Sequence, residues 1–153
     1  MPQADAVAVR DGTSATHLRE PAPFSLQQQF QQSGSGGRCN SRWLTAGDLS
    51  VGLAVGGNQI RVEDRGIIDS TRCYISSDGG TNAALVARGA VWTNEFELFV
   101  GDSGAQNTLI ISNDAAIGSE TGWLGFVSSS ISNLVRVTGV GLIWSTSDSF
   151  FVG

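Results

Sequence analysis

Few residues in the chain have side chains that could carry out chemistry, and they are far apart in the sequence. The one histidine, His17, has no cysteine or carboxylate around it at the spacing of metal ligands. A Ser-His-Asp or Cys-His arrangement would have to use this same histidine. We therefore expect no catalytic, cofactor-binding or metal-binding residues, and we interpret His17 as a solvated side chain of an N-terminal tail.

Three carboxylates are a second potential source of chemistry. Glu95 and Glu97 are expected on the same side of one strand, and Asp48 lies one double repeat before Glu97. Glycoside hydrolysis needs two carboxyl groups about 5–10 Å apart, which such an acidic stripe would supply. We interpret the three residues as a solvated outer face, and the acidic stripe of a carbohydrate-active enzyme remains the alternative.

The two cysteines, Cys39 and Cys73, would form a disulfide if the protein is exported and they meet. Their separation of 34 residues is not a whole number of the repeats described below, so we do not expect them to stack. Cys73 occupies an expected inward position opposite Leu49 and Leu98, where cysteine acts as a small apolar residue. The sequence leaves the oxidation state of both cysteines open.

Composition excludes several classes of protein. The 153 residues include nine arginines and no lysine, and the formal charge is −5. This acidic balance does not favour nucleic-acid binding, which needs a basic surface. No apolar run approaches the roughly 18 residues of a membrane-spanning helix, and no signal peptide is visible at the N-terminus. We therefore expect no membrane insertion by this segment.

The chain divides into two regions at about residue 42. Residues 1–42 contain all three prolines and carry a charge of +1, whereas residues 43–153 contain none and carry −6. The first region is expected to be an N-terminal arm or cap, with a Gly/Ser linker at 33–37. Within it, residues 25–32 either form a short helix that covers the end of the core or belong to a disordered arm.

Residues 43–153 repeat with a period of about 25 residues. Asparagines recur at 58, 82, 107 and 133, and each precedes two apolar residues in alternation. A second series of inward positions also recurs every 24 to 26 residues: Leu49/Val51, Cys73/Ile75, Leu98/Val100, Leu124/Phe126 and Phe150/Val152. A third series alternates tryptophan with isoleucine: Trp43, Ile68, Trp92, Ile117 and Trp144.

Short alternating strands at this period, with glycine and asparagine turns between them, are typical of a chain that coils back above itself. We therefore predict an all-β fold, a parallel β-helix (β-solenoid) of about four to five coils with about 25 residues per coil. Asparagine at a repeated corner tolerates left-handed backbone, and we expect the amides to stack outside the core. A β-sandwich is the alternative, although it would not require one residue type at one place in every cycle.

The stretch from Trp92 to Gly153 resembles the Gly/Asn-rich repeats of bacterial autotransporter-passenger-like and PEP-CTERM-associated proteins. The shared unit is W-x-x-x-x-x-L-x-V-G-x-x-G-x-x-N-x-L-x-I; the match covers 43–153 and is degraded between Val55 and Ala90. The resemblance implies an extracellular or bacterial outer-surface β-solenoid, generally part of a longer array. It transfers no catalytic residues, because the residues of the motif are structural.

The leading functional hypothesis is a structural or adhesive module of a secreted or cell-surface protein, without catalysis. The alternatives are a carbohydrate-binding or polysaccharide-degrading β-helix, and a phage or secreted fibre component. Because the chain stops in mid-repeat at Phe150–Gly153 without a polar cap, we expect a fragment of a longer array or a covered C-terminal end. The expected partners are a surface polysaccharide, or another copy or protein at that end.

Overall fold

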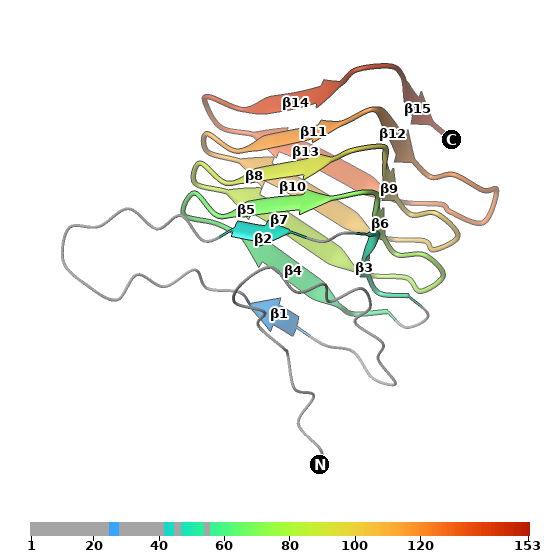
Figure 1. The fold of residues 1–153 in the computed structure, drawn as a ribbon. Helices are drawn as coiled ribbons and strands as arrows, with labels where there is room; N and C mark the ends of the chain where they lie inside the picture. The colour runs from blue at the N-terminus through green and yellow to red at the C-terminus, as the bar shows by residue number, and fades with distance from the viewer. Residues whose placement is uncertain (1–24, 28–41, 45–46, 54–55) are drawn as a thin grey trace, which may run out of the picture.

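The computed structural model describes residues 25–27, 42–44, 47–53 and 56–153. His17, Cys39 and the expected linker at 33–37 lie outside these residues. The described part is all-β, and its strands form three five-stranded parallel sheets. Each sheet receives one strand from every turn of the chain, so the turns stack into a β-solenoid (Figure 1). The predicted fold class is therefore confirmed.

We name the three sheets A, B and C, and a rung is one set of three consecutive strands. Sheet A contains β1 (Ser25–Gln27), β4 (Gln59–Val62), β7 (Ala83–Ala87), β10 (Thr108–Ser112) and β13 (Leu134–Thr138). Sheet B contains β2 (Arg42–Leu44), β5 (Ile67–Ser70), β8 (Val91–Asn94), β11 (Ala116–Ser119) and β14 (Ile143–Thr146). Sheet C contains β3 (Leu49–Val51), β6 (Cys73–Ile75), β9 (Glu97–Val100), β12 (Thr121–Leu124) and β15 (Phe150–Val152).

The N-terminal strand β1 corrects one expectation about the arm. Ser25–Gln27 pair in parallel with β4 and do not begin a helix. A strand is favoured here because the edge of β4 offers backbone hydrogen-bonding groups to any extended segment that reaches it. The remainder of the expected helix, 28–32, lies outside the described residues. Parallel pairing of sheet A thus extends upstream of the boundary placed at residue 42.

The alternation of tryptophan and isoleucine is confirmed in sheet B. Ile68 lies in register with both Trp43 and Trp92, and Ile117 lies in register with both Trp92 and Trp144. Trp92 and Trp144 are therefore two rungs apart on one side of the coil, as predicted. Alternating a large ring with a smaller branched side chain allows equal rungs to be filled at close-packed density.

One register assignment in sheet C was wrong. The residues above Leu98 and Val100 are Gly122 and Leu124, not Leu124 and Phe126. Gly122 in turn lies beneath Phe150, and a Cβ atom at Gly122 would lie 2.5 Å from a carbon of that ring. The ring of Phe150 therefore occupies the space that a side chain at Gly122 would take. Phe126 lies outside the strand and is 48 % exposed.

The asparagine ladder is confirmed in register, but it lies inside the coil. The backbone N–H and the Nδ2 group of Asn58 donate to Oδ1 of Asn82 at 2.9 and 2.8 Å. Asn82 donates in the same way to Asn107, and Asn107 donates to Asn133. Asn58, Asn82 and Asn107 are fully or almost fully buried. The amide oxygens of Asn82, Asn107 and Asn133 each accept from the backbone N–H of the asparagine one rung below, so these buried backbone donors are satisfied.

The left-handed backbone conformation expected at the ladder asparagines occurs instead at the residue before each of them. Positive φ angles occur at the preceding residues Gly57, Thr81, Gln106 and Ser132. Glycine is required at another turn position, where φ is +81° at Gly101 and a Cβ atom would lie 2.1 Å from Nδ2 of Asn133. The glycine of the repeated Val-Gly pair is thus explained, because the asparagine of the following rung occupies the space where a side chain at the glycine position would lie.

Replacing Asn107 with alanine is expected to be strongly destabilising. Two buried donors of Asn82 would lose their acceptor, at about 1–3 kcal/mol each, so we expect a loss of about 2–4 kcal/mol in the free energy of unfolding. Thr108→Ala, on the outer face of the adjoining strand β10, should change the free energy of unfolding by less than about 0.5 kcal/mol. Urea denaturation of the two variants tests this, and equal losses would contradict a ladder role for Asn107.

Burial along the inward positions of sheet A depends on the rung. Leu109 and Ile111 are fully buried, and Val135 and Val137 stack on them as predicted. Val135 is half-buried, however, and Val137 is 48 % exposed, so the prediction that both are buried was wrong. They belong to the last described rung, on which none of the described strands packs. Arg61 and Arg136 point outward, as expected.

The difference between Ile111 and Val137 predicts unequal costs of truncation. Ile111→Ala should lower the free energy of unfolding by about 2–4 kcal/mol, because it leaves a cavity in a fully packed rung. Val137→Ala should cost less than about 1 kcal/mol, because half of that side chain is already in contact with solvent. Thermal or urea unfolding of both variants is the measurement, and a larger loss for Val137→Ala would be inconsistent with this packing.

Candidate functional site

Two of the three carboxylates that could have formed an acidic stripe, Asp48 and Glu97, flank an arginine. Asp48, Arg72 and Glu97 each come directly before or at the start of a strand of sheet C, one on each of three successive rungs. Arg72 Nε donates to Glu97 Oε2 at 2.6 Å, and Arg72 Nη1 lies 3.9 Å from Asp48 Oδ1. The bond to Glu97 raises the pKa of Arg72 above its usual value, so the guanidinium remains charged. The stripe is therefore an alternation of charge.

Glu95 does not share a strand with Glu97. Strand β8 ends at Asn94 and β9 begins at Glu97, so Glu95 lies exposed in the bend between two sheets. The sequence contained the signal that these residues are not a carboxylate pair. Asp48 and Glu97 are two repeats apart, and Arg72 lies at the repeat between them, 24 residues after Asp48 and 25 before Glu97.

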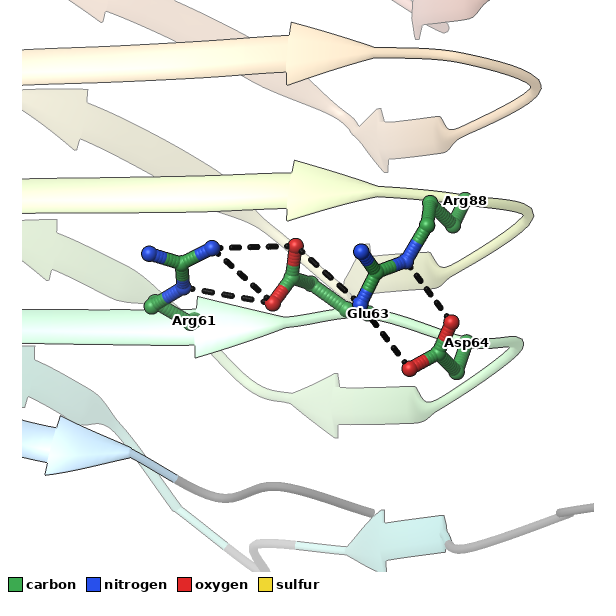
Figure 2. A network of polar contacts seen from close by, with 4 residues as sticks. All are labelled: Arg61, Glu63, Asp64 and Arg88. Atoms are coloured by element: carbon green, nitrogen blue, oxygen red, sulfur yellow. Dashed lines mark hydrogen bonds and ion pairs between the residues drawn. The ribbon is translucent and has the colours of Figure 1, made fainter. Parts of the chain in front are cut away.

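A second group of charges is also paired across rungs, at the corner between sheets A and B (Figure 2). Figure 2 shows Glu63 between two arginines, with oxygens 3.1 Å from Arg61 Nη2 and 3.5 Å from Arg88 Nη2. Arg88 also donates to both carboxylate oxygens of Asp64, at 2.7 and 2.9 Å. Two cations and two anions thus balance one another, and the network joins the turns of neighbouring rungs.

The outer face of sheet C carries a feature that the sequence reasoning missed. Tyr74, Phe99, Trp123 and Phe151 stand one above another on four successive rungs, with nearly parallel rings. Successive ring centroids are 4.9, 6.3 and 4.1 Å apart. We call these four residues the aromatic ladder. Their regular spacing is the signal in the sequence, but the wrong register at Phe126 concealed Trp123.

Phe126 flanks the aromatic ladder. Its ring is nearly perpendicular to those of Phe99 and Trp123, with centroids 5.4 and 4.9 Å away. Rings in a parallel stack cover one another's faces, so the ladder offers mostly ring edges to a ligand. The most accessible rings are Phe126, 48 % exposed, and Phe151, 43 % exposed. This apolar strip on an outer face can take part in adhesion or in contact with the apolar face of a sugar.

Nothing among the described residues brings His, Cys, Asp or Glu together in a group that could hold a metal ion. Cys73 is fully buried between Leu49 and Leu98, as predicted, and burial raises the pKa of its thiol well above the usual value. A thiol in that state is protonated and unreactive. Within the described ranges, no helix is long and apolar enough to cross a membrane.

The aromatic ladder can be observed directly, because Tyr74 is the only tyrosine of the chain. Burial, followed by the nearby Asp48 carboxylate, raises the pKa of Tyr74 above its ordinary value of about 10, and Arg72 acts in the opposite direction. Its neutral form therefore contributes stability below pH about 10, which is lost as the pH rises through the raised pKa. Titration followed by phenolate absorbance should give a raised pKa for Tyr74 in the unmodified chain. This pKa should be lower in Asp48→Asn and higher in Arg72→Gln. An ordinary pKa in all three proteins would contradict the stacked environment.

The geometry thus offers two surfaces for interaction. One surface is the aromatic ladder with Phe126, and the other is the last rung, formed by β13, β14 and β15. Comparison of the chain with protein-family models, with curated proteins and with solved structures finds no match to any of them.

Proposed function

We propose that the chain is a structural and adhesive module of a secreted or cell-surface β-solenoid protein, and that it acts through its outer faces without catalysis. The observation that carries this proposal is the aromatic ladder on the outside of sheet C. Aromatic rings on a solvated face cost solubility, and their persistence over four rungs suits a surface that binds. The extracellular setting follows from the resemblance of the repeat unit to bacterial surface proteins.

Pairing of the acidic residues supports a role without catalysis. A glycosidase needs one carboxyl group that holds a proton and a second that is free to attack or to activate water. Glu97 and Asp48 instead share the guanidinium of Arg72, whose nitrogens lie 2.6 Å from a Glu97 oxygen and 3.9 Å from an Asp48 oxygen. An arginine shared between the two carboxyl groups does not suit a free catalytic pair at the position where the sequence offered one.

A carbohydrate-binding solenoid is the second candidate, and Phe126 is the observation that favours it. Its exposed ring lies beside Trp123, and aromatic side chains present an apolar surface that complements the C–H face of a sugar. The parallel stack itself is less suited to this role, because the faces of its inner rings are covered. The candidate ligand is thus a surface polysaccharide that contacts the rim of the ladder.

Binding to insoluble cellulose, chitin and peptidoglycan would test both candidates. If the ladder binds, Phe126→Ala should reduce the bound fraction by roughly 3- to 10-fold, equivalent to the 0.5–1.5 kcal/mol of an aromatic contact. The matched control is Leu85→Ala with Ile110→Ala, which removes half-buried apolar side chains from the outer face of sheet A. The control should bind as the unmodified chain does.

The same samples can be assayed for the release of reducing ends. We expect none from the unmodified chain. Polysaccharide cleavage that disappears in the variant Glu95→Gln with Glu97→Gln would overturn the proposal that the module is not an enzyme. Equal binding of the Phe126→Ala and control variants would reject the aromatic ladder as the adhesive surface.

A further inference from the structure

Apolar side chains on the last rung are more exposed than their counterparts one rung below. Leu134, Val137 and Ile143 are 52, 48 and 58 % exposed, whereas Ile111, directly beneath Val137, is fully buried. On the same rung, Phe150, Phe151 and Val152 are also exposed. Most of the exposed large hydrophobic residues of the described chain are therefore concentrated at one end of the solenoid. We call the strands β13, β14 and β15 the open rung.

Backbone groups point out of this rung as well. In the rung below, the N–H of Asn107 donates to Asn133 Oδ1 and its carbonyl accepts from the N–H of Leu134, so both groups point toward β13. The direction of backbone hydrogen bonding alternates along a strand. The backbone N–H and C=O groups therefore point away from β10 at Asn133, Val135 and Val137. Among the described strands, none lies beyond β13, β14 or β15 to receive them.

We propose that the open rung binds the first rung of a second copy of this chain, head to tail. The strands β1, β2 and β3 form the opposite edges of the same three sheets and run in the same direction as β13, β14 and β15 (Figure 1). Translation of one copy along the solenoid axis therefore continues all three sheets in parallel. A twofold dimer joined through two open rungs would oppose the strand directions, and the registered ladders could not continue.

Register predicts what meets at this junction. Leu26 shares its register with Ile60, and hence with the apolar series that ends at Val135, so an apolar position would follow another. Trp43 shares its register with Trp144, so two tryptophans would be adjacent where every internal rung alternates tryptophan with isoleucine. The side chains that meet at the junction are thus less complementary than those between two rungs of one chain. The association should therefore be reversible and dependent on concentration.

Copies related by translation along the solenoid axis cannot form a closed ring, so head-to-tail association produces an open filament. Filament growth would hold whether or not the aromatic ladder binds a polysaccharide. The structure also provides a way to block each end separately. Val137→Pro removes an N–H that points away from β10, so it blocks addition without removing a bond inside the chain. By the same alternation, Gln27→Pro removes an N–H that points away from β4.

Sedimentation velocity and electron microscopy of the 153-residue chain over a range of concentrations test the proposal. The unmodified chain should form particles that lengthen with concentration, and Val137→Ala, which retains the N–H, should do the same. Val137→Pro alone and Gln27→Pro alone should each remain monomeric, whereas an equimolar mixture should form dimers and nothing longer. The near-ultraviolet circular dichroism of the aromatic ladder shows that each variant is folded.

Val137→Lys is the second blocking variant, for use if the proline variant loses the circular dichroism signal. It retains the backbone and places a charge in the junction, and it should also be monomeric. A monomeric unmodified chain at the highest concentration would overturn the proposal. Dimers of Gln27→Pro alone would overturn it too, because they would show contact between two open rungs.

Discussion

Each residue of a rung lies directly above its counterpart one turn earlier, about 4.8 Å away, and the rest of the structure depends on this registration. The asparagine ladder maintains it at one corner. A single Oδ1 atom receives both the backbone N–H and the side-chain amide of the asparagine below. Because these groups are buried, a shift of one residue would leave several donors without acceptors. The ladder therefore fixes the register of all three sheets.

Registration also explains how the residues of the three sheets are chosen. A position that recurs in every turn must accommodate its neighbours above and below, so bulky and small side chains alternate, as do charges of opposite sign. Gly122 beneath Phe150 shows the first kind of pairing, and Arg72 between two carboxylates shows the second. The same rule brings rings together on the outer face of sheet C, where stacking is favourable. Structural repetition thus generates both the core and the candidate binding surface.

The fold could be predicted because its signal is periodic and local sequence patterns agree with it. The asparagine spacing and the alternation of tryptophan with isoleucine identified the turns and two of the three sheets correctly. The register in the fourth turn of sheet C could not be read in this way, because Gly122 has no side chain and the apolar Phe126 nearby mimics the pattern. Burial of Val137 was overestimated because sequence pattern does not show how many strands cover a rung.

The candidate site was predicted less well than the fold. The spacing of the acidic residues indicated potential catalysts, whereas the arginine that pairs with two of them lies at the intervening repeat. The aromatic residues have the required spacing, but they occupy outward positions that the apolar pattern of the core does not single out. Function at a solenoid surface depends on which side chains meet between turns, and this becomes visible when every register position is compared.

The most direct test of the registered ladder is hydrogen exchange of asparagine side-chain amides, followed by nuclear magnetic resonance after transfer to deuterated solvent. The account predicts that the Nδ2 protons of Asn58, Asn82 and Asn107 persist long after that of Asn113, whose side chain is exposed. Their protection should approach that of the backbone amides in β7 and β10, because both depend on opening of the same rungs. Exchange of all four side-chain amides at the same rapid rate would contradict the buried ladder and, with it, the registration of the solenoid.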